Sequence, residues 1–182
     1  MIKGYETTHF GASHAPVRML TTVRYLISMV GQHGWTINYL DVVTAFLNPE
    51  IDDDDVYMTL PEGWPDGPKA PTIIVQLKKA LYGLKQAPRL WYNDINIFFL
   101  SFKFTLSQAH TNYYLPSDGI LMLLYIDDIS MLYPIDVTKA GIEVKARLSE
   151  KYKITNLSPA RQFLGIEIHF KQNGNCTGIS RG

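Results

Sequence analysis

The sequence predicts an α+β fold, in which helices cover one face of an antiparallel or mixed sheet. Apolar residues recur at three- and four-residue steps in some segments, a spacing that indicates amphipathic helices. Other segments are short apolar or β-branched runs bounded by turn residues, which indicate strands. Their order is helix, strand, strand pair, helix, hairpin, helix, strand, and it favours a single α+β domain over residues 1–182.

Composition excludes several classes of protein. The chain has 46% hydrophobic and 19% charged residues, which is typical of a globular domain. Its one cysteine, Cys176, excludes an internal disulfide framework. We find no signal peptide and no apolar run long enough to span a bilayer, so we expect a cytoplasmic protein without a membrane partner. Seventeen basic residues balance seventeen acidic ones, which argues against a broad nucleic-acid surface but allows a local basic patch.

The first elements lead to an aspartate. Residues 1–15 read as an irregular lead-in, and a helix is expected from Pro16 to just before Gly31 or Gly34. Residues 35–40 read as a strand with Asp41 directly after it. A carboxylate at the end of a buried strand is a common site position, and it is equally typical of a residue that caps a turn.

The middle of the chain contains an acidic run and a basic segment. Four aspartates at 52–55 cannot converge on one ion without a glycine-turned loop, so we interpret them as a solvated turn before a strand at 56–58. A proline-rich loop at 61–71 precedes a strand at 72–77. Residues 78–89 contain four cations and no acid, which makes this segment a candidate phosphate contact or simply a solvated loop.

The later elements are two helices, a hairpin and a strand. Apolar stripes predict helices over 89–102 and 137–152, and residues 163–170 read as a last strand, followed by an Asn-Gly turn at 173–174 and a short tail. Between the helices, we expect residues 121–126 to pair with 129–133, with Asp127 and Asp128 at the bend.

Adjacent carboxylates in an apolar run suggest either a turn that faces water or a cation site. If the strand before Asp41 lies beside the hairpin, then Asp41, Asp127 and Asp128 converge into the oxygen-rich environment that Mg²⁺ prefers. Two such ions about 3.5–4 Å apart serve both polymerases and nucleases. The carboxylates alone do not separate these two activities.

Five ordered blocks give the chain a specific resemblance. Residues 125–128, Tyr-Ile-Asp-Asp, resemble the YxDD signature of reverse transcriptases. Residues 40–48, Leu-Asp-Val-Val-Thr-Ala-Phe-Leu-Asn, resemble a stretch of copia-type (pseudoviral) retrotransposon polymerases, and blocks at 56–63, 77–92 and 163–168 agree in order and spacing. The resemblance implies a reverse-transcriptase palm with a ferredoxin-like core, an antiparallel sheet backed by helices, and partial fingers.

The resemblance also implies a role for each matching residue. Asp41, Asp127 and Asp128 would be the catalytic carboxylates that bind two Mg²⁺ ions, or Mn²⁺ as a substitute, with the Val42 carbonyl as a further metal ligand. The residues expected at the incoming deoxynucleotide and template are Val42, Phe46, Tyr82, Gly83, Lys85, Gln86 and Arg89, and those expected in the primer grip are Leu164, Gly165 and Ile166. The implied partners are an RNA or DNA template, a nucleic-acid primer, deoxynucleoside triphosphates and the remainder of a Pol polyprotein, in a cytoplasmic virus-like particle.

The chain also departs from the family pattern. Pro49 and His110 stand where the family has Gly and Asp, and residues 157–160 read Leu-Ser-Pro-Ala in place of Leu-Gly-Glu-Leu. We expect the basic fingers block before Lys3 and the ribonuclease H and integrase segments to be absent from this chain. Two alternatives to an active polymerase therefore stay open: a degenerate remnant that folds and binds nucleic acid without polymerising it, and a two-metal nuclease.

Overall fold

A computed structural model describes residues 20–51, 56–61, 64, 73–107, 113–115, 119–157, 162–163, 166–170 and 176–181. The chain forms two compact units. The smaller unit contains Phe46–Asp94 and the larger unit contains Pro16–Ala45 and Ile95–Gly182, and α2 (Ala87–Ser101) runs from one into the other. The predicted lead-in at 1–15 and the acidic run at 52–55 lie outside the described residues.

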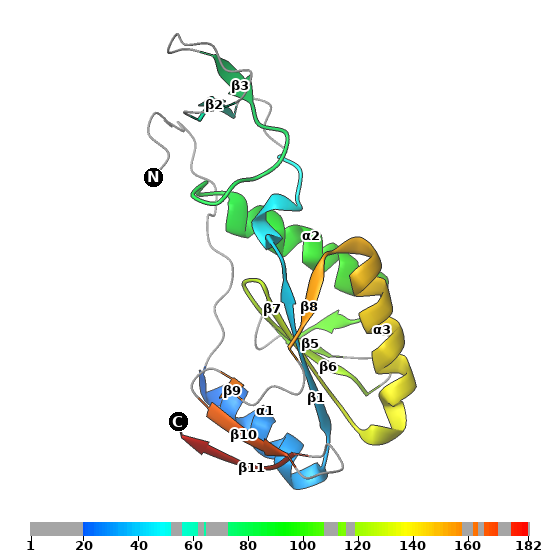
Figure 1. The fold of residues 1–182 in the computed structure, drawn as a ribbon. Helices are drawn as coiled ribbons and strands as arrows, with labels where there is room; N and C mark the ends of the chain where they lie inside the picture. The colour runs from blue at the N-terminus through cyan, green and yellow to red at the C-terminus, as the bar shows by residue number, and fades with distance from the viewer. Residues whose placement is uncertain are drawn as a thin grey trace. The chain divides into compact units, whose positions relative to one another are not determined.

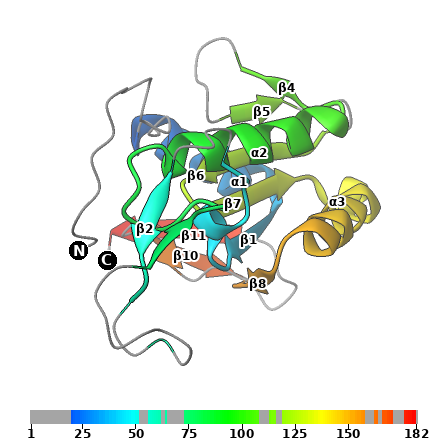
Figure 2. The same cartoon turned by 90° about the horizontal axis from the view of Figure 1, so that it is seen from above.

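The larger unit is built on a six-stranded sheet in which every neighbouring pair is antiparallel (Figure 1). The strand order is β4-β5-β6-β7-β1-β8. The strands are β1 (Thr36–Val42), β4 (Thr105–Leu106), β5 (Tyr113–Leu115), β6 (Leu121–Tyr125), β7 (Asp128–Tyr133) and β8 (Ile154–Asn156). Figure 2 shows β6, β7 and β1 in the middle of this unit, with α3 (Thr138–Lys151) beside the sheet.

Helices cover both faces of the sheet, which corrects the prediction that they share one face. Ile27 and Val30 of α1 (Leu20–His33) join a buried cluster with Ile37 and Leu132 on one face. On the other face, a Cβ added at Gly141 of α3 would collide with the ring of Tyr133. The hydroxyl of Tyr114 on β5 donates a hydrogen bond of 3.1 Å to the Asn96 side chain of α2.

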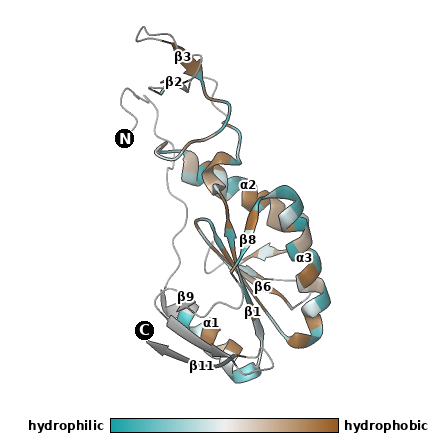
Figure 3. Ribbon diagram, in the orientation of Figure 1, coloured by the Kyte–Doolittle hydropathy of each residue, from teal (hydrophilic) through white to brown (hydrophobic). Residues whose placement is uncertain are grey.

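The apolar stripes that predicted the helices form their buried faces. In α3 the buried residues Gly141, Val144 and Leu148 recur at three- and four-residue steps, and Figure 3 shows hydrophobic and hydrophilic residues along that helix. In α2 the rings of Phe98 and Phe99 are buried. Within the described residues, no helix is long and apolar enough to cross a membrane.

Among the described residues, four strands went unpredicted. Strands β4, β5 and β8 are only two or three residues long, and they gain their pairing from longer neighbours. The prediction of one strand at 163–170 is wrong, because β9 (Gln162–Phe163) and β10 (Ile166–Phe170) are two strands that pair antiparallel, with Ile166 opposite Phe163. The predicted short tail contains β11 (Cys176–Arg181), which pairs with the other edge of β10 and completes a three-stranded sheet. The predicted Asn-Gly turn at 173–174 lies outside the described residues.

The smaller unit has a core of its own. Strands β2 (Tyr57–Thr59) and β3 (Ile74–Gln76) form an antiparallel pair, as their apolar runs predicted. The buried residues of this core are Val56, Ala80, Leu84, Ala87 and Leu90. Pro49 is buried, and its carbonyl accepts a hydrogen bond of 3.2 Å from the Ala80 N–H. The turn at this proline is therefore held by the core of the smaller unit.

Candidate catalytic site

The hairpin between β6 and β7 bends one residue earlier than predicted. Its two turn residues are Ile126 and Asp127, while Asp128 is the first residue of β7 and lies opposite Tyr125. The prediction that Asp127 and Asp128 share the bend is therefore wrong. With this register, Leu124 lies opposite Ile129, and both side chains are buried.

Ile126 has a backbone conformation that is rare for its residue type. Its φ is +57°, whereas Asp127, the other turn residue, is not among the residues with positive φ. A β-branched residue at positive φ is strained, because its side chain crowds the backbone. Thr44, just after β1, has a φ of +54°. Two strained residues thus flank the carboxylates.

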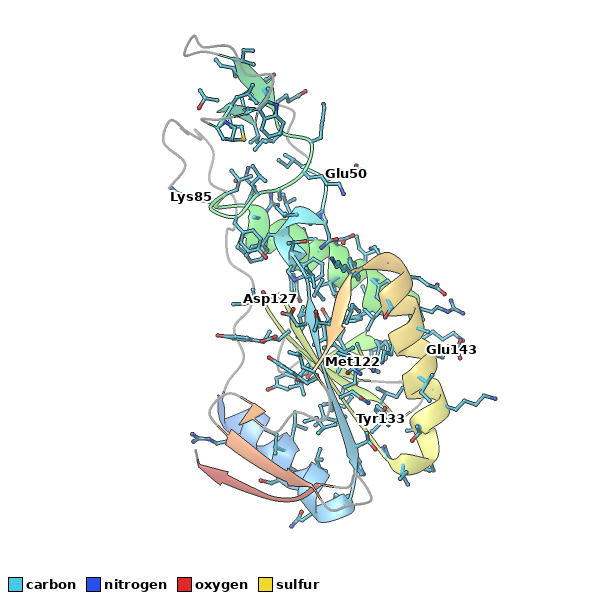
Figure 4. All side chains as sticks on the ribbon, viewed as in Figure 1. Glu50, Lys85, Met122, Asp127, Tyr133 and Glu143 are labelled. Atoms are coloured by element: carbon cyan, nitrogen blue, oxygen red, sulfur yellow. The ribbon has the colours of Figure 1, made fainter. Side chains whose placement is uncertain are left out.

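Asp41 lies inside β1 rather than after it, because β8 pairs with Leu40, Asp41 and Val42 and extends the strand. On the other side of β1, Asp41 is the direct partner of Asp128. Directly opposed residues of an antiparallel pair point to the same face, with Cβ atoms about 4.5–5.5 Å apart. The N–H of Val42 donates a hydrogen bond of 3.0 Å to the Asp127 carbonyl, so the turn is attached to the same end of β1 (Figure 4).

The register places two like charges opposite each other. Asp41, Asp127 and Asp128 are all partly exposed, and like charges at directly opposed positions destabilise a sheet. Their oxygens fit a hard divalent cation, which would remove this repulsion. In the part of the chain that the structure describes, no three His, Cys, Asp or Glu side chains converge on a point that could hold an ion. The backbone thus brings the three aspartates together, while their carboxylates are not gathered around one point.

In the smaller unit, two predicted nucleotide contacts are neighbours. Phe46, in the 3-10 helix Ala45–Leu47, packs against Tyr82 with ring centroids 4.9 Å apart. Tyr82 and Gly83 are the central residues of a turn closed by a 3.1 Å hydrogen bond from the Leu84 N–H to the Leu81 carbonyl. Gly83 has a φ of +99°, which a type II turn requires at its third residue.

The predicted basic contacts follow this turn. Lys85 is exposed, whereas Gln86 and Arg89 are partly buried where α2 begins. The Gln86 carbonyl accepts a 3.0 Å hydrogen bond from the Leu90 N–H, which attaches the loop to the first turn of the helix. Of these predicted contacts, Phe46 and Tyr82 pack together, and Gly83, Lys85, Gln86 and Arg89 follow Tyr82 in the loop and the first turn of α2.

The whole chain matches one protein family. The model of that family, reverse transcriptase (RNA-dependent DNA polymerase), matches residues 1–180. The chain belongs to the reverse transcriptases. Residues 125–128, which resemble the YxDD signature, form the end of the β6–β7 hairpin, and Asp128 lies opposite Asp41.

The relatives are retrotransposon polyproteins of the copia and Ty1 type. The chain is 34% identical over 171 residues to the retrovirus-related Pol polyprotein from transposon RE1 of Arabidopsis thaliana. This match covers 91% of the chain and 11% of the polyprotein. The chain is 32% identical over 176 residues to the Pol polyprotein from transposon TNT 1-94 of Nicotiana tabacum, covering 92% and 13%. The chain therefore spans about an eighth of these relatives. The chain is also 34% identical over 141 residues to the putative transposon Ty5-1 protein of Saccharomyces cerevisiae. That match covers 76% of the chain and 44% of the yeast protein.

The predicted primer grip of this reverse transcriptase domain is only partly described. Leu164 and Gly165 lie outside the described residues, and Ile166 begins β10, opposite Phe163 and Arg181. Sequence reasoning did not single out Tyr39, which lies on the same face of β1 as Asp41. The alternation of strand residues could have identified Tyr39, because residues two apart in a strand, such as Tyr39 and Asp41, share a face.

Proposed function

We propose that the chain is the polymerase domain of a copia-type retrotransposon, an RNA-directed DNA polymerase. The observation that carries this proposal is the pairing of Asp41 with Asp128 next to the turn that contains Asp127. In this proposal the larger unit is the palm with its ferredoxin-like core, and the smaller unit is part of the fingers.

In the proposed reaction, a primer 3′-hydroxyl attacks the α-phosphorus of a deoxynucleoside triphosphate. A phosphorus–oxygen bond forms to the primer, the bond to the β-phosphate breaks, and pyrophosphate leaves. Two Mg²⁺ ions, held by Asp41, Asp127, Asp128 and the Val42 carbonyl, would supply charge stabilisation for the attacking and leaving oxygens. The aspartates and the turn act by positioning, since phosphoryl transfer requires little covalent chemistry from a protein.

The smaller unit would select the nucleotide. Phe46, supported by the ring of Tyr82, would clash with a ribose 2′-hydroxyl and so favour deoxynucleotides. Lys85 and Arg89 would neutralise phosphate charge, and Gly83 would let the backbone approach the base or template. Leu164, Gly165 and Ile166 would hold the primer. The expected setting is the remainder of a Pol polyprotein in a virus-like particle.

Primer extension tests this proposal. On a poly(rA) template with an oligo(dT) primer, dTTP and Mg²⁺, the chain is expected to extend the primer, and Asp127→Asn is expected to lose that activity. Failure of both proteins to extend the primer would overturn the polymerase proposal. Cleavage of unprimed nucleic acid that disappears in the same variant would point instead to a two-metal nuclease.

A further inference from the structure

The face on which Asp41 and Asp128 lie depends on the register between β1 and β7. Successive strand residues alternate between faces, so a slip of one residue would move Asp41 to the face that carries Leu40. The two strands are separated in the sequence by β2 to β6, so no tight turn sets their register.

Burial distinguishes the two faces of these strands poorly. All five residues of β7 after Asp128 are buried, and apart from Ser130 they carry large apolar or aromatic side chains on both faces of the strand. In β1, Ile37 and Leu40 are buried on opposite faces. A slipped pairing would therefore still bury apolar side chains, so apolar burial selects the register only weakly and a directional contact would add to the selection.

A directional side-chain contact joins β1 to β7. The side-chain amide of Asn38 donates a hydrogen bond to the hydroxyl of Tyr133, which is buried at 3% exposure. Met131 lies directly opposite Asn38 and Thr36 directly opposite Tyr133, so the bond runs diagonally on one face. Figure 4 shows Tyr133 at the end of the hairpin away from Asp127.

Helix α3 fixes the end of the Tyr133 ring that makes this bond. A Cβ added at Gly141 would lie 2.7 Å from Cζ, 2.9 Å from Cε1 and 3.1 Å from Oη of Tyr133. Real Cβ atoms do not approach ring atoms so closely, so any side chain at position 141 would displace the hydroxyl end of the ring. A side chain at position 141 is therefore expected to disturb the bond between Tyr133 and Asn38.

We infer that Gly141, Tyr133 and Asn38 form a register lock, which positions Asp41 opposite Asp128. The three are positioning residues, because none of them is among the proposed metal ligands. Their role in catalysis rests on the proposed function, whereas their effect on register does not.

The chain offers a matched control for this inference. Tyr114, also on the sheet and fully buried, donates a hydrogen bond to the side chain of Asn96. That bond joins β5 to α2, so its loss should not affect the pairing of β1 with β7. Tyr133→Phe and Tyr114→Phe each remove one buried hydroxyl of the same kind, and their costs in stability should be similar.

Nuclear magnetic resonance on the full chain tests the register lock. Tyr133→Phe and Asn38→Ala are expected to weaken the nuclear Overhauser effects between the backbone protons of residues 41 and 128, and to lower Mn²⁺ affinity about fivefold, roughly the effect of one hydrogen bond. Tyr114→Phe is expected to leave these Overhauser effects and the Mn²⁺ affinity unchanged. The lock is overturned if Tyr133→Phe preserves those effects, or if Tyr114→Phe weakens them equally. A wild-type chain that binds no Mn²⁺ would contradict the proposed function, while the Overhauser effects would still decide the register.

Discussion

At the scale of single residues, the fold places like charges together at a cost. Asp41 and Asp128 are opposed on neighbouring strands, although like charges in this position repel. Ile126 holds a strained turn beside them. Destabilising features of this kind are typical of sites that are selected for function rather than stability.

Asp41→Asn is predicted to stabilise the chain when no metal is present, because it removes one of two opposed charges. The expected gain in free energy of unfolding is at most about 1 kcal/mol at low ionic strength, and it should shrink as salt is added. Urea unfolding in the presence of a chelator measures it. The exposed Asp136 offers a control, since Asp136→Asn removes a charge that has no such partner in the sheet. A clear loss of stability in Asp41→Asn would contradict the opposed placement.

Tyr133 is predicted to reduce stability at high pH. Burial raises the pKa of its phenol, and the hydrogen bond from Asn38 lowers the pKa by a smaller amount. In the unfolded chain the phenol ionises near pH 10. Below that pH the neutral Tyr133 contributes fully to the stability of the fold, and this contribution is lost as the pH rises through the higher pKa that the phenol has in the folded chain. Urea midpoints measured from about pH 8 to about pH 11 should therefore fall less steeply in Tyr133→Phe. If the urea midpoints of the wild type and Tyr133→Phe fell equally steeply with pH, folding would not raise the pKa of Tyr133.

At the scale of elements, the sequence predicted long and periodic segments well. The stripes of α2 and α3 were clear because four-residue repeats of apolar side chains persist over several turns. The bend at Ile126 could not be predicted, since a β-branched residue at positive φ is unfavourable and the bend follows from the register of the whole β6–β7 pair. The short strand β8 also carries little signal of its own, because it forms by pairing with β1, which is distant in the sequence.

Packing of α2 on the sheet is predicted to depend on its buried aromatic residues. Phe99 is fully buried, with its ring centroid 4.7 Å from that of Tyr114 and 6.2 Å from that of Phe104. Phe99→Ala should lower the free energy of unfolding by about 3–5 kcal/mol. Ile97 on the same helix is 66% exposed, so Ile97→Ala should change it by less than about 0.5 kcal/mol. Similar losses in the two variants, measured by urea unfolding, would mean that the helix packs through a different face.

At the scale of the whole molecule, the predicted site residues belong to two compact units. The sequence allowed an arrangement in which the strand that leads to Asp41 lies beside the hairpin, and the sheet pairs the two strands in this way. The residue patterns favoured a single domain, and only the family resemblance implied a palm with partial fingers, whereas the structure has two units, with Phe46 and Tyr82 in one and the aspartates in the other. Linear order cannot reveal such a division, because the smaller unit is an insertion between β1 and the second half of α2.

Divalent-cation binding tests the central claim most directly, because it does not require the complete polymerase reaction. Electron paramagnetic resonance of free Mn²⁺ would measure the affinity of the wild-type chain, Asp41→Asn, Asp127→Asn and the control Asp136→Asn. We expect the wild type and Asp136→Asn to bind Mn²⁺ alike, and each site variant to bind at least about tenfold more weakly. Equal affinities in all four proteins, or no binding by the wild type, would contradict the assignment of these aspartates as a metal site.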